Sequence, residues 1–73
     1  MYIVKRELTL GTAYFSGYAV LEKTGVIVPD FSFSRDDAVL FEKYEDAAKA
    51  SRRWGRGTVI KPINEWGYIK EED

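Results

Sequence analysis

The chain has 73 residues, a formal net charge of −1, and neither cysteine nor histidine. This length allows one domain, and the missing cysteines exclude disulfides and thiolate metal sites. The missing histidines also remove the commonest metal ligand and the usual general base. Stability must therefore come from the burial of apolar surface, for which a content of 45% hydrophobic residues is sufficient.

The N-terminal part of the sequence predicts a pair of antiparallel strands. Residues 2–8 are rich in strand-forming side chains, and residues 13–21 alternate between two faces. The glycine within residues 10–12 indicates a turn between the two strands. On the second strand, simple alternation places Tyr14 and Tyr18 on the same face.

The middle of the chain predicts short and irregular elements. Residues 26–28 form a brief strand, and the Pro-Asp pair at residues 29–30 ends it. Phenylalanine and serine alternate over residues 31–34, which predicts an irregular edge segment with both rings tucked under the sheet. The two aspartates at residues 36–37 indicate a turn, and residues 38–41 are predicted to form another strand.

An amphipathic helix is predicted from Tyr44 to Trp54. Small or apolar side chains recur at helical spacing on one face, at Tyr44, Ala47, Ala48, Ser51 and Trp54. Acidic side chains lie in the first turn and basic ones in the last, which complements the helix dipole. Gly55 or Gly57 ends the helix, whereas Lys43 is a poor N-cap.

After the helix, residues 58–60 predict a strand, and Pro62 marks its end or an edge position. Residues 64–70 are predicted to form a last short strand or to pack across the base of the sheet. The acidic residues 71–73 are predicted to form a solvated tail. The predicted fold class is therefore α+β, with one amphipathic helix packed on a small, mainly antiparallel sheet in the order β-β-(β)-β-α-β. The whole of residues 1–73 forms this single domain.

The main candidate for a functional site is a segregation of charge. No acid falls between residues 47 and 64, where the basic residues are Lys49, Arg52, Arg53, Arg56 and Lys61. Together with Trp54, these arginines could contact an acidic protein surface, or bind phosphates while the indole stacks on a base. The alternative interpretation is that the bases only complement the helix dipole and that Trp54 fills the core. The net charge near zero argues against strong nonspecific DNA binding.

A second candidate site is the tyrosine face formed by Tyr14 and Tyr18. Aromatic side chains on an open sheet face can stack on single-stranded bases or contact another protein. Tyrosine is also a good strand residue in its own right, so a purely structural interpretation stays open.

Catalysis, cofactors and metals are not expected. The four serines have no histidine to activate them, and residues 55–57 are too short to cradle a phosphate. The acidic residues are Asp30, Asp36, Asp37, Glu42, Glu45 and Asp46. They lack the ligand spacing of a calcium loop, so we interpret them as a turn and the solvated start of the helix.

Several short motifs resemble those of small accessory proteins of bacteriophages and prophages. The motifs are Ala38-x-x-Phe41, Glu45-Asp46-Ala47 on the helix, a glycine, and Val59-Ile60-x-Pro62-Ile63. The segment over residues 14–18 is similar to the second strand of such proteins. The resemblance implies a non-catalytic protein of the host cytoplasm that binds a host protein. Some proteins of this type inhibit host defence systems such as CRISPR nucleases.

The sequence leaves three functional hypotheses. The first is binding to a host protein through the basic helix end, with the tyrosine face as second choice. The second is a nucleic-acid-binding module that uses Arg52, Arg53, Trp54 and Arg56. The third is a structural subunit that forms a homo-oligomer, such as a homodimer, through an uncovered sheet edge. No apolar run approaches membrane-spanning length, so we expect a soluble, cytoplasmic protein.

Overall fold

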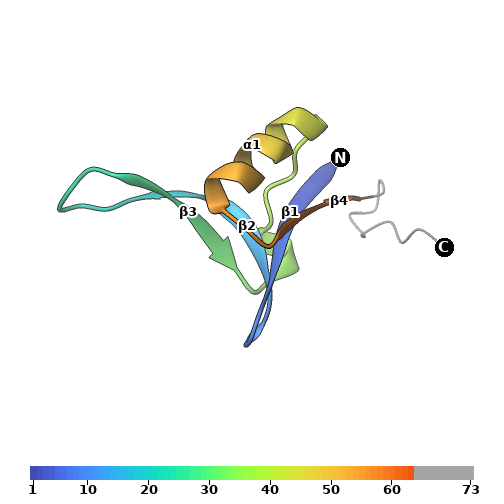
Figure 1. The fold of residues 1–73 in the computed structure, drawn as a ribbon, viewed down its shortest axis with the longest axis horizontal. Coiled ribbons are helices and arrows are strands. Elements are labelled where there is room, and N and C mark those ends of the chain that lie inside the picture. The colour runs from blue at the N-terminus through green and yellow to red at the C-terminus, as the bar shows by residue number, and fades with distance from the viewer. Residues whose placement is uncertain (64–73) are drawn as a thin grey trace.

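A computed structural model of the chain describes residues 1–63. Its strands form one antiparallel sheet in the order β3-β2-β1-β4, and a helix packs on one face of that sheet (Figure 1). The elements are β1 (Tyr2–Leu8), β2 (Gly11–Val20), β3 (Ile27–Ser32), the 3-10 turn η1 (Arg35–Asp37), α1 (Tyr44–Trp54) and β4 (Thr58–Pro62). The predicted α+β class with a single packed helix is confirmed.

The main core lies between α1 and the sheet. Val4, Phe15, Ala47 and Ala50 are each at most 2% exposed and pack together. The two alanines bring the helix close to the strands, so the Phe15 ring fills the space between the layers. This ring lies 5.8 Å from the Phe41 ring in a stacked arrangement, measured between the centroids.

The predicted buried face of α1 is correct at its centre and wrong at its start. Ala47 is buried as expected, and Ala50, which the prediction left out, is buried beside it. Tyr44 is 57% exposed because it lies in the first turn and packs only edge-on against the Tyr2 ring. Lys43 makes no side-chain capping bond, in agreement with its weakness as an N-cap.

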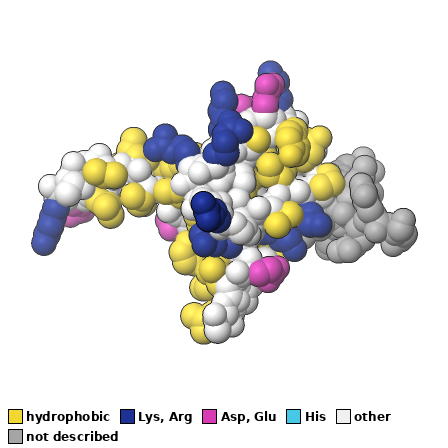
Figure 2. Space-filling view, viewed as in Figure 1, with side chains coloured by type: hydrophobic (Ala, Val, Ile, Leu, Met, Phe, Trp, Pro, Cys, Tyr) yellow, Lys and Arg dark blue, Asp and Glu magenta, His cyan; other side chains and the backbone are white. Residues whose placement is uncertain are grey.

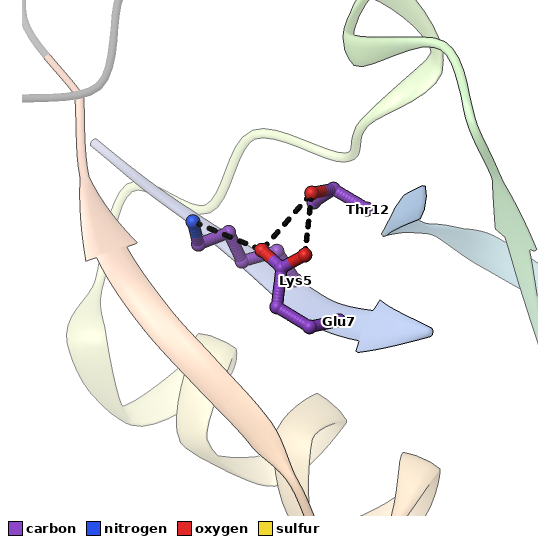
Figure 3. A network of polar contacts seen from close by, with 3 residues as sticks. All are labelled: Lys5, Glu7 and Thr12. Atoms are coloured by element: carbon purple, nitrogen blue, oxygen red, sulfur yellow. Dashed lines mark hydrogen bonds and ion pairs between the residues drawn. The ribbon is translucent and has the colours of Figure 1, made fainter. Parts of the chain in front are cut away.

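A smaller cluster covers part of the opposite face of the sheet. Ile3, Ala38 and Ile63 are buried there, and Tyr14 packs against them. Near the β1–β2 turn this face becomes polar (Figure 3). Thr12 Oγ1 donates to both carboxylate oxygens of Glu7, at 2.8 and 2.9 Å, and Glu7 lies 3.6 Å from Lys5 Nζ.

The strand predicted at residues 38–41 is not formed. Instead, this segment lies beside β1 and β2, with one backbone hydrogen bond to β2 and one isolated bridge to β1. The Val39 N–H donates to the Phe15 carbonyl at 2.9 Å, and Phe41 exchanges two backbone bonds with Tyr2. The backbone of this segment therefore pairs with backbone groups of two strands, although it forms a continuous ladder with neither.

The strand predicted at residues 26–28 is longer than expected. β3 runs through Pro29 and Asp30, because it lies at the edge of the sheet, where a proline is tolerated. The Phe31 and Phe33 rings are not tucked under the sheet: these residues are 42% and 50% exposed. Pro62 also lies on an edge strand and is the last residue of that strand, which confirms both interpretations of that residue.

The strand or packing segment predicted for residues 64–70 and the tail at residues 71–73 lie outside the described part of the chain. Within residues 1–63, no helix has both the length and the hydropathy that crossing a lipid bilayer requires.

Candidate binding surface on the β2–β3 arm

A β-bulge in β2 divides that strand into two parts. Phe15 pairs with Phe31, whereas Gly17 pairs with Asp30, so Ser16 is an extra residue without a partner in β3. The bulge reverses the alternation of side chains that follows it. Up to Phe15 the strand belongs to the body of the sheet. From Gly17 onward β2 and β3 form a hairpin arm that projects away from the body (Figure 1).

The predicted tyrosine face is wrong, and the bulge is the reason. Tyr14 lies on the face away from α1, packed against Ile3. Tyr18 lies on the helix face, where its ring contacts Phe15 at a centroid distance of 5.2 Å. Uninterrupted alternation would have kept both tyrosines on one face. The two rings therefore belong to different surfaces, and only Tyr18 is more than a third exposed.

The arm presents a continuous apolar surface on its helix face. Directly paired residues share a face of a sheet, so the register places five residues there. We call them the apolar stripe: Tyr18, Val20, Ile27, Pro29 and Phe31. Four of these are between 42% and 60% exposed, and Pro29 is half-buried. Hydrophobic side chains accordingly cover much of the visible arm in Figure 2.

The last turn of α1 contacts the root of this stripe. The Trp54 ring stacks on Phe31 at a centroid distance of 6.1 Å, with 21° between the ring planes. The Arg53 guanidinium lies over the Tyr18 ring, 5.4 Å from its centroid. A cation over an aromatic face at this distance is attracted by the ring quadrupole. The helix end and the arm thus form one surface in which aromatic rings and a cation are in contact.

The structure separates the predicted basic residues. Successive residues of an α-helix point about 100° apart, so Arg52 does not share the direction of Arg53. Lys49 lies one turn before Arg53 on the same side of α1, and its side chain is exposed. Arg56 is exposed in the turn between α1 and β4, and Lys61 lies on β4. We call Lys49 and Arg53 the basic flank of the stripe.

Two of the acidic residues make local hydrogen bonds. The Asp30 carboxylate accepts the Phe31 N–H at 2.8 Å, and Asp37 accepts the Ser32 hydroxyl at 2.7 Å. No group of three or more potential metal ligands gathers anywhere in residues 1–63. The ion pair between Lys5 and Glu7 involves neither residue of the basic flank, and among residues 1–63 both Lys49 and Arg53 lie more than 4.0 Å from any carboxylate.

Sequence reasoning found Tyr18, Arg53 and Trp54 but missed the stripe that joins them. The sequence predicts a short strand, a break and an irregular segment over residues 26–31. This interpretation does not reveal the pairing of Ile27 with Val20. The available signal was the Ser16-Gly17 pair, because a glycine inside a strand often marks a bulge. Gly17 has φ +128°, a value that other residues rarely adopt.

Comparison with known proteins found no match to a protein family, to a curated protein or to a solved structure. The resemblance to small phage accessory proteins therefore stays a prediction.

Proposed function

We propose that this chain is a non-catalytic binding protein that docks on another protein through the apolar stripe and its basic flank. The observation that carries the proposal is the exposure of the stripe: Tyr18, Val20 and Ile27 are 48%, 60% and 52% exposed on one side of a projecting hairpin. Contiguous exposed apolar surface with a polar border is typical of protein-interaction sites.

The composition of the surface also fits a protein partner. Aromatic residues and arginine are enriched at the centres of protein–protein interfaces, and here Arg53 contacts Tyr18 while Phe31 contacts Trp54. The phage resemblance makes a host protein, such as a component of a defence system, the first class of partner to test.

Binding of single-stranded nucleic acid has less support. Base stacking requires an accessible ring face, yet Trp54 stacks on Phe31 and Arg53 covers one face of Tyr18. The divergence of Arg52 from Arg53 also divides the cationic cluster on which phosphate binding would depend.

The test is a comparison of two single variants, Arg53→Glu and Arg52→Glu. Both change the same residue type in the last turn of one helix, but only Arg53 contacts the stripe. We expect Arg53→Glu to weaken partner binding by about tenfold or more, and Arg52→Glu to change it by less than about threefold. Binding is measured by affinity capture from bacterial lysate with and without nuclease treatment, followed by titration of the purified partner.

Three outcomes would contradict the proposal. Equal loss of binding in both variants would indicate a diffuse electrostatic contact that does not use the stripe. Equal retention in both variants would place the interface elsewhere. Capture that disappears after nuclease treatment would identify a nucleic acid as the ligand.

A further inference from the structure

We propose that the occupant of the apolar stripe is an amphipathic α-helix of the partner, with acidic residues on one flank. This inference rests on the function proposed above and specifies the shape and charge of the ligand. It follows from three features: the arrangement of the stripe, the blocked positions on the outer edge of β3, and the two cations of the basic flank, which have no carboxylate within 4.0 Å among residues 1–63.

The arrangement of the stripe suits a helix. Its residues lie on one face of two paired strands, and Trp54 packs against Phe31 at one end of that face. Ile27 and Phe31 are separated by four residue steps, or about 13 Å along the strand. A helix of about three turns spans about 16 Å and presents apolar side chains at every third or fourth residue.

The outer edge of β3 is poorly suited to receive an added strand. The Leu21 N–H donates to the Val26 carbonyl at 2.9 Å, which sets the alternation of bonded and non-bonded pairs along the arm. Tyr18 and Pro29 then form a non-bonded pair, so the Pro29 nitrogen faces outward and has no hydrogen to donate. The next outward N–H along β3 is that of Phe31, and it already donates to the Asp30 carboxylate.

The opposite edge of the sheet carries a similar block. Ile63 donates to the Met1 carbonyl at 2.9 Å, so Tyr2 and Pro62 form a non-bonded pair and the Pro62 nitrogen faces away from β1. Both prolines of the chain therefore stand at outward positions of edge strands. Natural sheets use proline in this way to prevent edge-to-edge pairing. This arrangement disfavours strand addition at the outer edges of β3 and β4, and with it a homo-oligomer paired through either of those edges.

The positive charge of the basic flank favours a ligand with acidic side chains. Arg53 touches the stripe through Tyr18, and Lys49 lies one turn away on the same side of α1. Neither has a carboxylate within 4.0 Å among the described residues. A carboxylate brought alongside by a docked helix would form new ion pairs at the border of the apolar contact, where they orient the ligand.

The experiment uses three synthetic peptides of about 15 residues, or four helical turns, each labelled for fluorescence anisotropy with the full-length chain. The first contains leucine at helical spacing and glutamate elsewhere. The second has the same composition with leucine at alternate positions, as in a strand. The third repeats the helical pattern with lysine in place of glutamate. We expect the first peptide to bind about tenfold more tightly than either of the others.

Variants of the chain locate the binding site. Val20→Lys combined with Ile27→Lys should remove binding of the first peptide, because both substitutions place a charge in the stripe. Val59→Lys is the matched control: Val59 is 44% exposed, but it pairs with Lys5 on the face away from α1. This control should bind like the unmodified chain.

The inference is overturned if the strand-pattern peptide binds as well as the helical one, or if the stripe variant keeps its affinity. It is also overturned if the chain forms a concentration-dependent dimer that the stripe variant abolishes, since a second copy would then be the occupant. Captured partner that depends on Arg53, together with no binding of the helical peptide, would exclude the helix and leave the proposed function standing.

Discussion

The two parts of β2 carry similar apolar residues on the helix face, but these residues are buried in one part and exposed in the other. In the body, Ala13 and Phe15 are both buried, and Phe15 packs between the helix and the sheet. In the arm, two residues past the bulge, Tyr18 and Val20 lie on that same helix face and are 48% and 60% exposed. The helix ends at Trp54 and does not extend over the arm.

This difference separates apolar surface that stabilises the fold from apolar surface that is available to a ligand. Full burial of a phenylalanine or valine side chain contributes about 1.5–3 kcal/mol. The body gains this contribution on folding, whereas the exposed part of the arm gains it only when another molecule covers the stripe. Substitutions in the body should therefore change stability, and substitutions in the arm should change binding.

The largest expected effect on stability is that of Phe15→Ala. Phe15 is 2% exposed and its ring contacts those of Phe41, Trp54 and Tyr18. Truncation should lower the free energy of unfolding by about 3–5 kcal/mol, enough to unfold much of so small a domain. Urea denaturation followed by circular dichroism measures the change. A loss below about 1 kcal/mol would mean that the body is not packed around this ring.

The bulge that divides the two regions is tested by Gly17→Ala. Gly17 has φ +128°, and a Cβ there would meet no atom within 4 Å, so only backbone strain opposes the substitution. We expect a loss of about 1–3 kcal/mol in the free energy of unfolding. Gly25→Ala, at φ +71° near the tip of the arm, is the matched substitution of a positive-φ glycine that lies outside the bulge. An unchanged stability of Gly17→Ala would indicate that β2 pairs without the bulge, and Tyr14 and Tyr18 would then share a face.

The start of α1 can be improved without touching either surface. Lys43 is the N-cap residue, with φ −112° and ψ 137°, and its side chain makes no capping bond. Serine in that position could accept a backbone N–H of the first turn, so Lys43→Ser should raise the stability by about 1 kcal/mol. Thermal unfolding checks the gain, with Lys43→Ala as the control for loss of the charge alone. Equal gains in both variants would attribute the effect to charge.

The smallest expected effect on stability belongs to the arm. Val20→Lys with Ile27→Lys alters two residues that are 60% and 52% exposed, so the free energy of unfolding should change by less than about 1 kcal/mol. The measurement is the same urea titration as for Phe15→Ala. A loss of about 2 kcal/mol or more would show that the arm packs against the body of the sheet, and the contrast between the two regions would then fail.

Much of this architecture was readable from local patterns. Helical spacing over residues 44–54 predicted α1 with its observed bounds, because the apolar face of the helix and the glycine that ends it are both local signals. Alternation predicted β1 in the same way. The sequence also predicts Tyr18, Arg53 and Trp54 as candidate binding residues, but as members of two unrelated sites.

The errors share one physical cause. Alternation along a strand assumes an unbroken register, and the single extra residue at Ser16 reverses the faces for the rest of β2. The same local view treated Pro29 as the end of a strand, although a proline is acceptable when its nitrogen faces outward from an edge. Edge position, register and pairing partner depend on residues distant in the chain.

Composition and periodicity were thus sufficient for the fold class, the helix and the lack of histidine and cysteine chemistry, because each depends on residue type or on neighbours within a few positions. The tertiary structure decided where the apolar surface stays exposed, since exposure depends on how far α1 extends over the sheet. It also decided which cations accompany that surface. Arg53 reaches Tyr18 only because the bulge turns that ring toward the helix, and no local pattern contains both residues.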